Sequence, residues 1–512
     1  MSSTQSISLS PAVAGGRLVG ARMSSGAFAL CGVLFVALAI RGAVVWTQTY
    51  VPFVDETFQY FEQGHRLAFG SGLVPWEFQD GARSWLVPGL IGGLMRLTSV
   101  ITADPLVYVR LIRLLCVVLS LVVVLAGFGL GRRQAGLFGG IVAGGFCAIW
   151  FDAIYFAPAV LTEVLAAHCA ILAIFLGESG EPAAPRLMAC VGALFGLAFC
   201  LRYQYAPGML AAMLWRYRLS WTHWRWLLTG GLAVVVPVAG VLDALTWGTP
   251  FQSIWLNLAR NSVQGVSAGM GVEPPTFYLS YLAVALQPLP LLLALAVLGA
   301  IRAPALALAA AVTLVEHSLV PHKEVRFIYL VIAAAPVLIG LGLVELSRLR
   351  LGRRFAPAAP AMVLAAGSAL SWWTGTVALG PRWQFERANV EVFLAANREA
   401  RMCGLAVRDV WFWETGGYTW LNRDVPLYFA DYDPGRTLPG TDRKLSLIVM
   451  DRGRPVPQIT GDRLGAAAAR YSHMIAKRGD AEPGYEPVAC FNDVARNGEP
   501  DVCLFRRPGG CS

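Results

Sequence analysis

Apolar runs close to twenty residues long recur along this chain of 512 residues, and they restrict its fold more than any other feature. A helix needs about twenty apolar residues to cross a bilayer. Charged residues make up only 14% of the chain, against about 25% in soluble domains. We therefore predict an all-α polytopic membrane protein with about eleven transmembrane helices. The expected spans are 27–46, 108–131, 135–151, 160–177, 187–201, 204–217, 227–247, 276–301, 303–320, 327–346 and 356–378.

The net charge of +9 comes mostly from arginines in the short loops between these runs. If the N-terminus lies in the cytoplasm, every inner loop is basic, and most acidic residues of the membrane part lie outside. This is the positive-inside pattern, so the basic balance orients the protein and implies no nucleic-acid partner. The predicted organisation is a disordered cytoplasmic N-terminus 1–26, a membrane domain 27–378 with a first outer loop 47–107, and a soluble exoplasmic domain 379–512.

Two segments outside the spans have a character of their own. The stretch 85–100 is apolar, and we predict that it forms a re-entrant or interfacial helix. The C-terminal segment is polar, with strand-like and helix-like runs, which predicts a small α/β domain. Its even number of cysteines suggests disulfides with three possible pairings, and free thiols are the alternative. These cysteines are Cys403, Cys490, Cys503 and Cys511.

A polar string separates two apolar runs between residues 321 and 327. Ionisable side chains at membrane depth are costly unless they pair or bind something, so they indicate a functional site by default. Lys323 stands out because it is the only lysine before Lys444 in a chain rich in arginine. Lysine and arginine suit a lipid-linked phosphate, and a self-satisfied salt-bridge cluster is the alternative. The ionisable members of the string are His322, Lys323, Glu324 and Arg326.

Three further carboxylates and one arginine lie at the same predicted face. The adjacent Asp55 and Glu56 act as bases where burial raises their pKa, or they form an ordinary acidic start to an interfacial helix. Glu163 begins an apolar helix, where it is either a second active-site carboxylate or a residue that favours the helix dipole. Arg202 ends a span and is either a phosphate ligand or an interface anchor.

The segment 70–85 of the first outer loop contains glycine, proline, tryptophan and charged residues. Trp76 offers a stacking face for a sugar ring, and Glu77 offers a hydrogen-bond acceptor beside it. The alternative for Trp76 is an anchor in the aromatic belt at the membrane interface. Arg83 follows a few residues later and adds a cation to this loop.

Together these segments resemble glycosyltransferase family 22, the GT-C enzymes that include the GPI-anchor and N-glycan-precursor α-mannosyltransferases. The string 322–327 matches the family's His-Lys-Glu-x-Arg-Phe. Residues 55–59 match its acidic pair and glutamine, although the family's preceding His-Pro is absent. Residues 70–84 match its Gly-x-Gly-x-x-Thr-Trp-Glu and Arg-Ser, with Pro75 in place of threonine. The likeness extends over about residues 30–350.

The resemblance implies a GT-C fold and an inverting transfer of mannose from a polyprenyl phosphate to a lipid-linked or glycan hydroxyl on the exoplasmic face. Asp55 is then the expected general base, and Glu56 and Glu163 are expected to orient sugar or acceptor. The expected substrate-binding residues are Arg202, His322, Lys323 and Arg326 at the donor phosphate, Trp76 and Glu77 at a sugar ring, and Arg83 and Glu324 beside them.

Several alternatives stay open from the sequence. The donor sugar is either mannose or another polyprenyl-linked sugar, and a flippase or transporter for lipid-linked sugars would instead carry charges along several spans. The resemblance requires no metal ion, and a divalent ion bridged by Asp55 and Glu163 is the alternative. The arginine bias suggests a bacterial inner membrane with a periplasmic site, or the endoplasmic reticulum membrane in a eukaryote.

Overall fold

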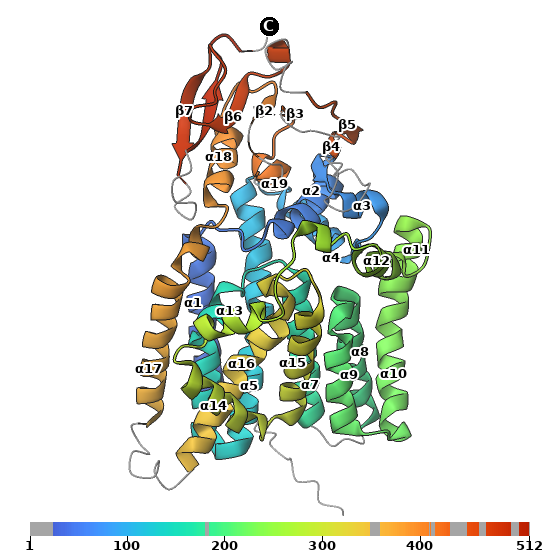
Figure 1. The fold of residues 1–512 in the computed structure, drawn as a ribbon, viewed down its shortest axis with the longest axis vertical. Helices are drawn as coiled ribbons and strands as arrows, with labels where there is room; N and C mark the ends of the chain where they lie inside the picture. Colours follow the sequence, from blue (N-terminus) through green and yellow to red (C-terminus); the bar gives the residue numbers. More distant parts are fainter. Residues whose placement is uncertain are drawn as a thin grey trace, which may run out of the picture.

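Helices form the lower body of the molecule, and strands are concentrated in a smaller upper part (Figure 1). This computed structural model describes residues 24–179, 184–348, 359–408, 410, 415–430, 448–459, 467–492 and 501–510. Most of the predicted cytoplasmic N-terminus and Cys511 lie outside the described residues. The helices of the lower body are α1 Ser25–Thr47, α5 Pro105–Ile149, α6 Phe151–Tyr155, α7 Thr162–Ser179, α8 Pro185–Leu201, α9 Ala206–Tyr217, α10 Trp221–Val235, α13 Phe277–Ala285, α14 Leu289–Ala300, α15 Pro304–Leu319, α16 Tyr329–Arg348 and α17 Ala359–Trp373.

The longest helix, α5, is a hairpin of two helices. Its backbone leaves the helical conformation at Ala135 and Gly136, and Gly136 has a φ of +60°. The two arms then pack closely, because a Cβ on Gly131 would lie only 2.2 Å from the carbonyl oxygen of Gly139. Glycine therefore permits the close approach of the arms. The two arms correspond to the predicted spans 108–131 and 135–151.

Four helical runs of the described residues are long and apolar enough to cross a membrane: Ser25–Thr47, Pro105–Ile149, Trp221–Trp247 and Val325–Arg348. The pair α13 and α14 adds a fifth if it counts as one span, but it bends by 99°. The predicted span 276–301 is therefore broken into two helices. Pro288 and Pro290 explain the break, because proline lacks the N–H that would continue a helix. The count of about eleven spans stays a prediction.

The first outer loop folds into short elements between α1 and α5. They are η1 Glu56–Phe61, α2 Glu62–Phe69, β1 Gly72–Val74, α3 Trp76–Asp80 and α4 Leu86–Thr98. Helix α4 occupies the apolar stretch 85–100 and has 13 residues, too few to cross a bilayer. It packs on α2, where a Cβ on Gly92 would lie 2.9 Å from the carbonyl oxygen of Gly64.

The upper part combines α18 Arg387–Arg398 and α19 Gly417–Leu421 with a five-stranded sheet. Its strand order is β3-β2-β6-β8-β7, in which β3, β2 and β6 are parallel and β8 and β7 are antiparallel. A disulfide joins Cys490 on β7 to Cys503 on β8, and Cys403 is also disulfide-bonded, as the cysteine pattern suggested. The strands are β2 Leu405–Val407, β3 Leu427–Phe429, β6 His473–Lys477, β7 Glu486–Phe491 and β8 Val502–Arg506.

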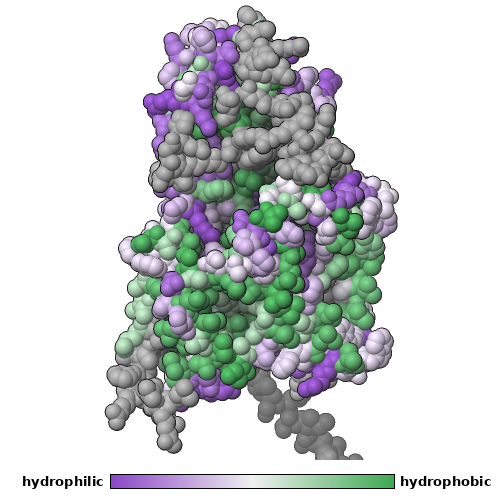
Figure 2. All heavy atoms as spheres, viewed as in Figure 1, coloured by the Kyte–Doolittle hydropathy of each residue, from purple (hydrophilic) through white to green (hydrophobic). Residues whose placement is uncertain are grey.

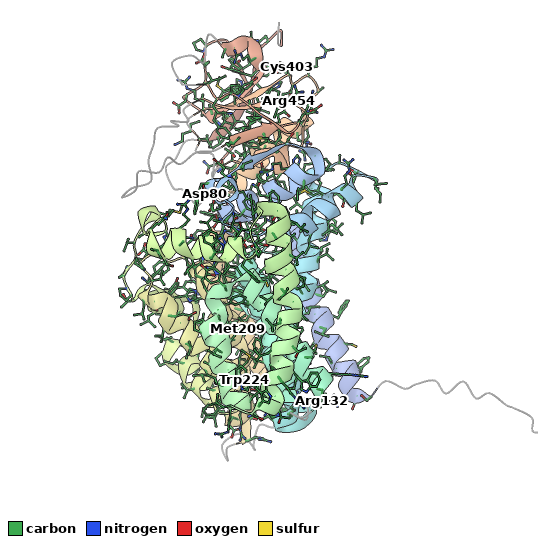
Figure 3. The ribbon with its side chains drawn as sticks, turned by 90° about the vertical axis from the view of Figure 1, so that its right-hand side faces the viewer. Asp80, Arg132, Met209, Trp224, Cys403 and Arg454 are labelled. Carbon is green, nitrogen blue, oxygen red and sulfur yellow. A yellow bond between two sulfur atoms is a disulfide. The ribbon has the colours of Figure 1, made fainter. Side chains whose placement is uncertain are left out.

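The surface of the molecule separates the two parts by polarity. Hydrophobic residues dominate the lower body, whereas hydrophilic residues gather over the upper part (Figure 2). Arg132 and Trp224 lie at the far end of the helix bundle, and Asp80 lies at its junction with the upper part (Figure 3). Arg132, from a predicted inner loop, and Asp80, from the predicted first outer loop, thus lie toward opposite ends of the helix bundle, and the orientation in the membrane stays a prediction.

Candidate active site

An ion-pair cluster lies at the end of the helix bundle that faces the upper part. Arg326 donates a hydrogen bond to Asp55 and another, of 2.7 Å, to Glu324. Its Nε is 3.8 Å from Glu163, whose carboxylate also pairs with Arg202 at 3.2 Å. The structure thus joins residues from four distant segments. We call these five residues the outer cluster: Asp55, Glu163, Arg202, Glu324 and Arg326.

Aromatic rings fix the two arginines of the outer cluster. Phe327 lies beneath both of them, with its ring centroid 4.7 Å from Arg202 Cζ and 5.2 Å from Arg326 Cζ. The ring of Phe53 is also close to Arg326, with its centroid 5.1 Å from Arg326 Cζ. Cation–π contacts and burial hold the guanidinium planes in place. The Arg326-Phe327 dipeptide therefore supplies both a charge and its support.

Asp55 is the carboxylate of the outer cluster whose exposure and hydrogen bonds suit a general base. Its side chain is 22% exposed, whereas that of Glu163 is 2% exposed. Its Oδ2 accepts from Arg326, and its Oδ1 accepts no hydrogen bond from any described residue. A general base needs such a free lone pair within reach of the proton that it removes.

Glu56 is adjacent in sequence but points elsewhere. It is fully buried, pairs with Arg113 at 2.9 Å, and accepts a hydrogen bond of 3.0 Å from the backbone N–H of Val160. Burial raises its pKa, and Arg113 opposes that shift. The structure therefore satisfies both oxygens of Glu56 with protein groups and does not bring it into the outer cluster.

A cavity borders the outer cluster. Its wall includes Arg83, Arg202 and Tyr60. The Nε atoms of both arginines are buried and have no hydrogen-bond partner in the described part of the chain. Arg202 is already paired with Glu163, but Arg83 has no carboxylate within ion-pair distance among the described residues. An anion entering this cavity would therefore meet an unpaired cation.

Arg83 stays charged in this setting. Burial alone lowers its pKa, but the nearby Tyr60, Glu77, Asp55 and Glu163 raise it overall. The backbone beside it is held in two places, because Trp247 donates to the carbonyl of Arg83 and Asn257 donates to the carbonyl of Ala82.

Glu77 and Trp76 lie behind the cavity wall. Glu77 accepts a hydrogen bond of 2.9 Å from Gln59. Burial raises the pKa of Glu77 to about 7, with Arg83 opposing and Asp55 supporting that shift. Trp76 is 8% exposed and packs in a small apolar cluster with Ala82 and Val266. Its ring is thus occupied by protein contacts rather than presented to the cavity.

His322 is bound at both ring nitrogens, 3.1 Å from Glu324 and 3.0 Å from the carbonyl oxygen of Gly271. The hydrogen bond to Glu324 raises the pKa of His322. Burial alone would raise the pKa of Glu324, but Arg326 and His322 lower it to about 2. His322, Glu324 and Arg326 therefore form a charged row, and both nitrogens of His322 are turned to protein groups.

Lys323 lies apart from the outer cluster. Its Nζ donates to the backbone carbonyls of Glu273 at 2.8 Å, Val320 at 2.5 Å and Pro321 at 3.4 Å. The side chain is buried, and it ties the polar string to the segment before α13. The expected convergence of Lys323 with Asp55, Glu163 and Arg202 is not seen.

Sequence reasoning missed two residues that shape the site. Arg113 neutralises Glu56, and it could have been noticed as a charge near the start of the predicted span 108–131. Tyr60 lines the cavity and shares a hydrogen bond of 2.7 Å with Thr162, beside Glu163. No sequence pattern distinguishes Tyr60 from the other aromatic residues of the loop.

Within the described residues, no group of three or more histidine, cysteine, aspartate or glutamate side chains could hold a metal ion. The carboxylates of Asp55 and Glu163, the alternative metal ligands, instead share Arg326 between them. The metal independence of the site stays a prediction.

Comparison with known proteins identifies the family. The profile of the Alg9-like mannosyltransferase family matches residues 32–379. The chain belongs to this family. The resemblance drawn from the motifs is thereby confirmed. The family also confirms the predicted enzyme class, a mannosyltransferase.

Two curated relatives carry the same name. GPI mannosyltransferase 3 of Yarrowia lipolytica is 26% identical over 329 residues, which are 58% of this chain and 59% of that protein. GPI mannosyltransferase 3 of Drosophila melanogaster is 42% identical over 74 residues, which are 14% of this chain and 13% of that protein. The chain thus aligns with less than two thirds of either relative.

Among solved structures, ArnT from Cupriavidus metallidurans is similar in fold. The form bound to undecaprenyl phosphate gives a TM-score of 0.57 at 13% identity and covers 94% of this chain and 98% of that chain. The apo form gives a TM-score of 0.59. This Alg9-like family member is therefore a mostly helical integral membrane protein with a GT-C fold.

Proposed function

We propose that this Alg9-like protein transfers mannose from a polyprenyl-phosphate donor to a hydroxyl of a lipid-linked or glycan acceptor. The observation that carries the proposal is the cavity beside the outer cluster, which is lined by Arg83, an arginine without a carboxylate partner among the described residues, and by Arg202 of the outer cluster itself. A lipid carrier keeps its chain in the membrane and presents its phosphate at the interface. We infer that the outer cluster, at the end of the apolar helix bundle, lies close to that interface.

Arg83 and Arg202 are the proposed ligands of the donor phosphate. Both line the cavity, and both keep a buried Nε without a partner among the described residues. Arginine suits phosphate because its planar fork donates two parallel hydrogen bonds. The ArnT structure that shares this fold was determined with undecaprenyl phosphate, which is consistent with a lipid-linked phosphate as donor. Arg83 thus replaces Lys323 among the phosphate ligands that were expected from the sequence.

Asp55 is the proposed general base. The acceptor oxygen attacks the anomeric carbon, the bond from that carbon to the phosphate oxygen breaks, and the acceptor proton passes to Asp55 Oδ1. The polyprenyl phosphate leaves with the bonding electrons, and configuration inverts. Arg83 and Arg202 stabilise the charge that develops on the leaving phosphate. Arg326 holds the carboxylates of Asp55 and Glu163 close to each other.

We place this reaction on the exoplasmic side, where the acidic outer loop and the disulfide-bonded upper part lie in the charge-based orientation. In a bacterium this is the periplasmic face of the inner membrane, and in a eukaryote it is the lumen of the endoplasmic reticulum. Disulfides persist in both compartments, which supports this side.

Reconstitution tests the proposal. Proteoliposomes of the full chain receive polyprenyl-phosphate mannose with a radiolabelled sugar and a panel of lipid-linked and glycan acceptors. We expect label in the acceptor fraction for the wild type and for Asp480→Asn, a control at a C-terminal loop, and loss of that label in Asp55→Asn.

Other outcomes decide between the alternatives. Transfer from a polyprenyl-linked arabinose, glucose or aminosugar donor, without transfer from the mannose donor, would replace the sugar in the proposal. Movement of intact carrier across the bilayer without transfer would replace the enzyme by a flippase.

A further inference from the structure

The first outer loop and the C-terminal part share a small sheet. Strand β1 of the loop pairs antiparallel with β4 Ile448–Asp451, which in turn pairs with β5 Arg454–Pro455. Gly72 lies opposite Met450, and Val74 lies opposite Ile448. A strand of three residues is too short to be stable alone, so β1 depends on its partner from the C-terminal part.

One buried carboxylate joins the same two parts. Glu62 is fully buried, and its Oε2 accepts a hydrogen bond of 2.8 Å from the backbone N–H of Leu73 on β1. Its Oε1 accepts from Thr419 on α19 through both the backbone N–H at 2.6 Å and the hydroxyl at 2.5 Å. Glu62 therefore bridges β1 and α19, and no described cation neutralises it.

The backbone of α19 is shaped for this approach. A Cβ on Gly417 would lie 2.6 Å from the carboxylate carbon of Glu62, and Gly417 has a φ of +58°. Asn422, which ends α19, contributes its Oδ1 to a 2.9 Å hydrogen bond with His65 of the outer loop. Tyr108 of α5 donates to the carbonyl of Thr419. Several polar contacts thus fix the position of α19 against the loop and α5.

A short path leads from this junction to the cavity. Strand β1 ends at Val74, and α3 begins two residues later at Trp76. The turn after α3 is closed by a hydrogen bond of 2.7 Å from the Ala82 N–H to the Glu77 carbonyl, and Arg83 follows directly. Strand β1 is thus linked through α3 to the cavity wall that carries Arg83.

We propose that Glu62 and Thr419 are positioning residues through which the C-terminal part holds Arg83 at the donor phosphate. This inference rests on the proposed function, because it assigns a role to the C-terminal part in donor binding. Neither residue lines the cavity, so both act through β1 and α3.

The test combines kinetics with hydrogen exchange in the full-length protein. Thr419→Val removes the hydroxyl but keeps the shape and the backbone N–H, and Thr419→Ser restores the hydroxyl. We expect the donor KM of Thr419→Val to rise about tenfold or more with a smaller change in kcat, since small misplacements near a site are costly. Thr419→Ser should recover most of the loss.

A double-mutant cycle separates positioning from general loss of fold. In an Arg83→Ala background, Thr419→Val should raise the donor KM little further, because both changes remove the same contact. Amide exchange in peptides covering residues 72–84 should be faster in Thr419→Val. The control is Thr374→Val, at a buried threonine whose hydroxyl has no partner among the described residues, and it should leave exchange in 72–84 unchanged.

Two outcomes overturn the inference: unchanged exchange in 72–84, or effects on donor KM that multiply independently of Arg83. If the wild type transfers no sugar from any donor, the proposed function fails instead. The exchange result, together with binding of polyprenyl phosphate alone, then decides whether Thr419 positions Arg83.

Discussion

Asp55 and Glu56 are neighbours in sequence, yet they end in opposite settings. Glu56 is fully buried, and both of its oxygens are bound by Arg113 and the Val160 N–H. Asp55 is partly exposed beside Arg326 and keeps one oxygen without a described partner. A wide helical turn begins here with η1, so consecutive side chains face different layers. The same carboxylate chemistry thus serves packing at one position and, as we propose, catalysis at the next.

The largest expected effect falls on Asp55. Asp55→Asn should lower kcat by about a thousandfold, because general-base catalysis contributes roughly 10²–10⁴ in rate. Stability should change little, because Arg326 keeps its contacts with Glu324 and Glu163. Initial rates and thermal unfolding in detergent check both parts. Activity above a tenth of the wild-type value would remove Asp55 from the chemistry.

Glu56 should show the reverse behaviour. Glu56→Gln leaves the buried Arg113 without its anion and should lower the free energy of unfolding by about 3–5 kcal/mol. Replacing Glu56 and Arg113 together by methionine should recover part of this loss, because the uncompensated charge is gone. Chemical denaturation measures the effect. A fully stable but inactive Glu56→Gln protein would instead place Glu56 in the reaction.

Arg83 and Lys323 extend the comparison to the cations. Arg83→Ala should raise the donor KM by about 10- to 100-fold. The donor KM of Arg83→Lys should lie between those of the wild type and Arg83→Ala, because lysine binds phosphate as a point charge. Lys323→Met should lower stability by about 1–2 kcal/mol but leave the donor KM near that of the wild type, because its Nζ satisfies backbone carbonyls. Steady-state kinetics with varied donor distinguishes the two. A raised donor KM in Lys323→Met together with an unchanged donor KM in Arg83→Ala would instead identify Lys323 as the phosphate ligand.

The last prediction concerns pH and tests the burial of Glu77. Burial raises the pKa of Glu77 from 4.5 to about 7, so the folded protein binds this proton more tightly than the unfolded chain. The contribution of Glu77 to stability is therefore greatest below about pH 4.5 and declines by about 3 kcal/mol as pH rises to about 7. Glu77→Gln should flatten this part of the stability profile. If the free energy of unfolding of Glu77→Gln falls between pH 5 and 7 as steeply as that of the wild type, the prediction is contradicted.

The helical membrane part was predictable because apolar length is a strong physical signal, whereas the orientation inferred from arginine placement stays a prediction. The convergence of Asp55, Glu163, Arg202 and Arg326 could be anticipated from charges at one face, although their roles stay predictions. The contacts of Lys323 could not be predicted, because the sequence does not say whether a buried cation pairs with a carboxylate or with backbone carbonyls.

The junction between the loop and the C-terminal part was also beyond sequence reasoning. Strand β1 is only Gly72–Val74 and has no alternating pattern, and its partner β4 lies more than 370 residues away. Glu62 has no motif that marks it as a bridge. The break between α13 and α14, in contrast, could have been predicted from Pro288 and Pro290 inside the expected span.

The most direct test is a structure of the full-length protein with a polyprenyl phosphate bound, determined in lipid nanodiscs. We predict that the phosphate lies in the cavity within hydrogen-bond distance of both Arg83 and Arg202, with Asp55 on the side open to the acceptor. A phosphate bound at Lys323, or anywhere away from the outer cluster, would contradict the account.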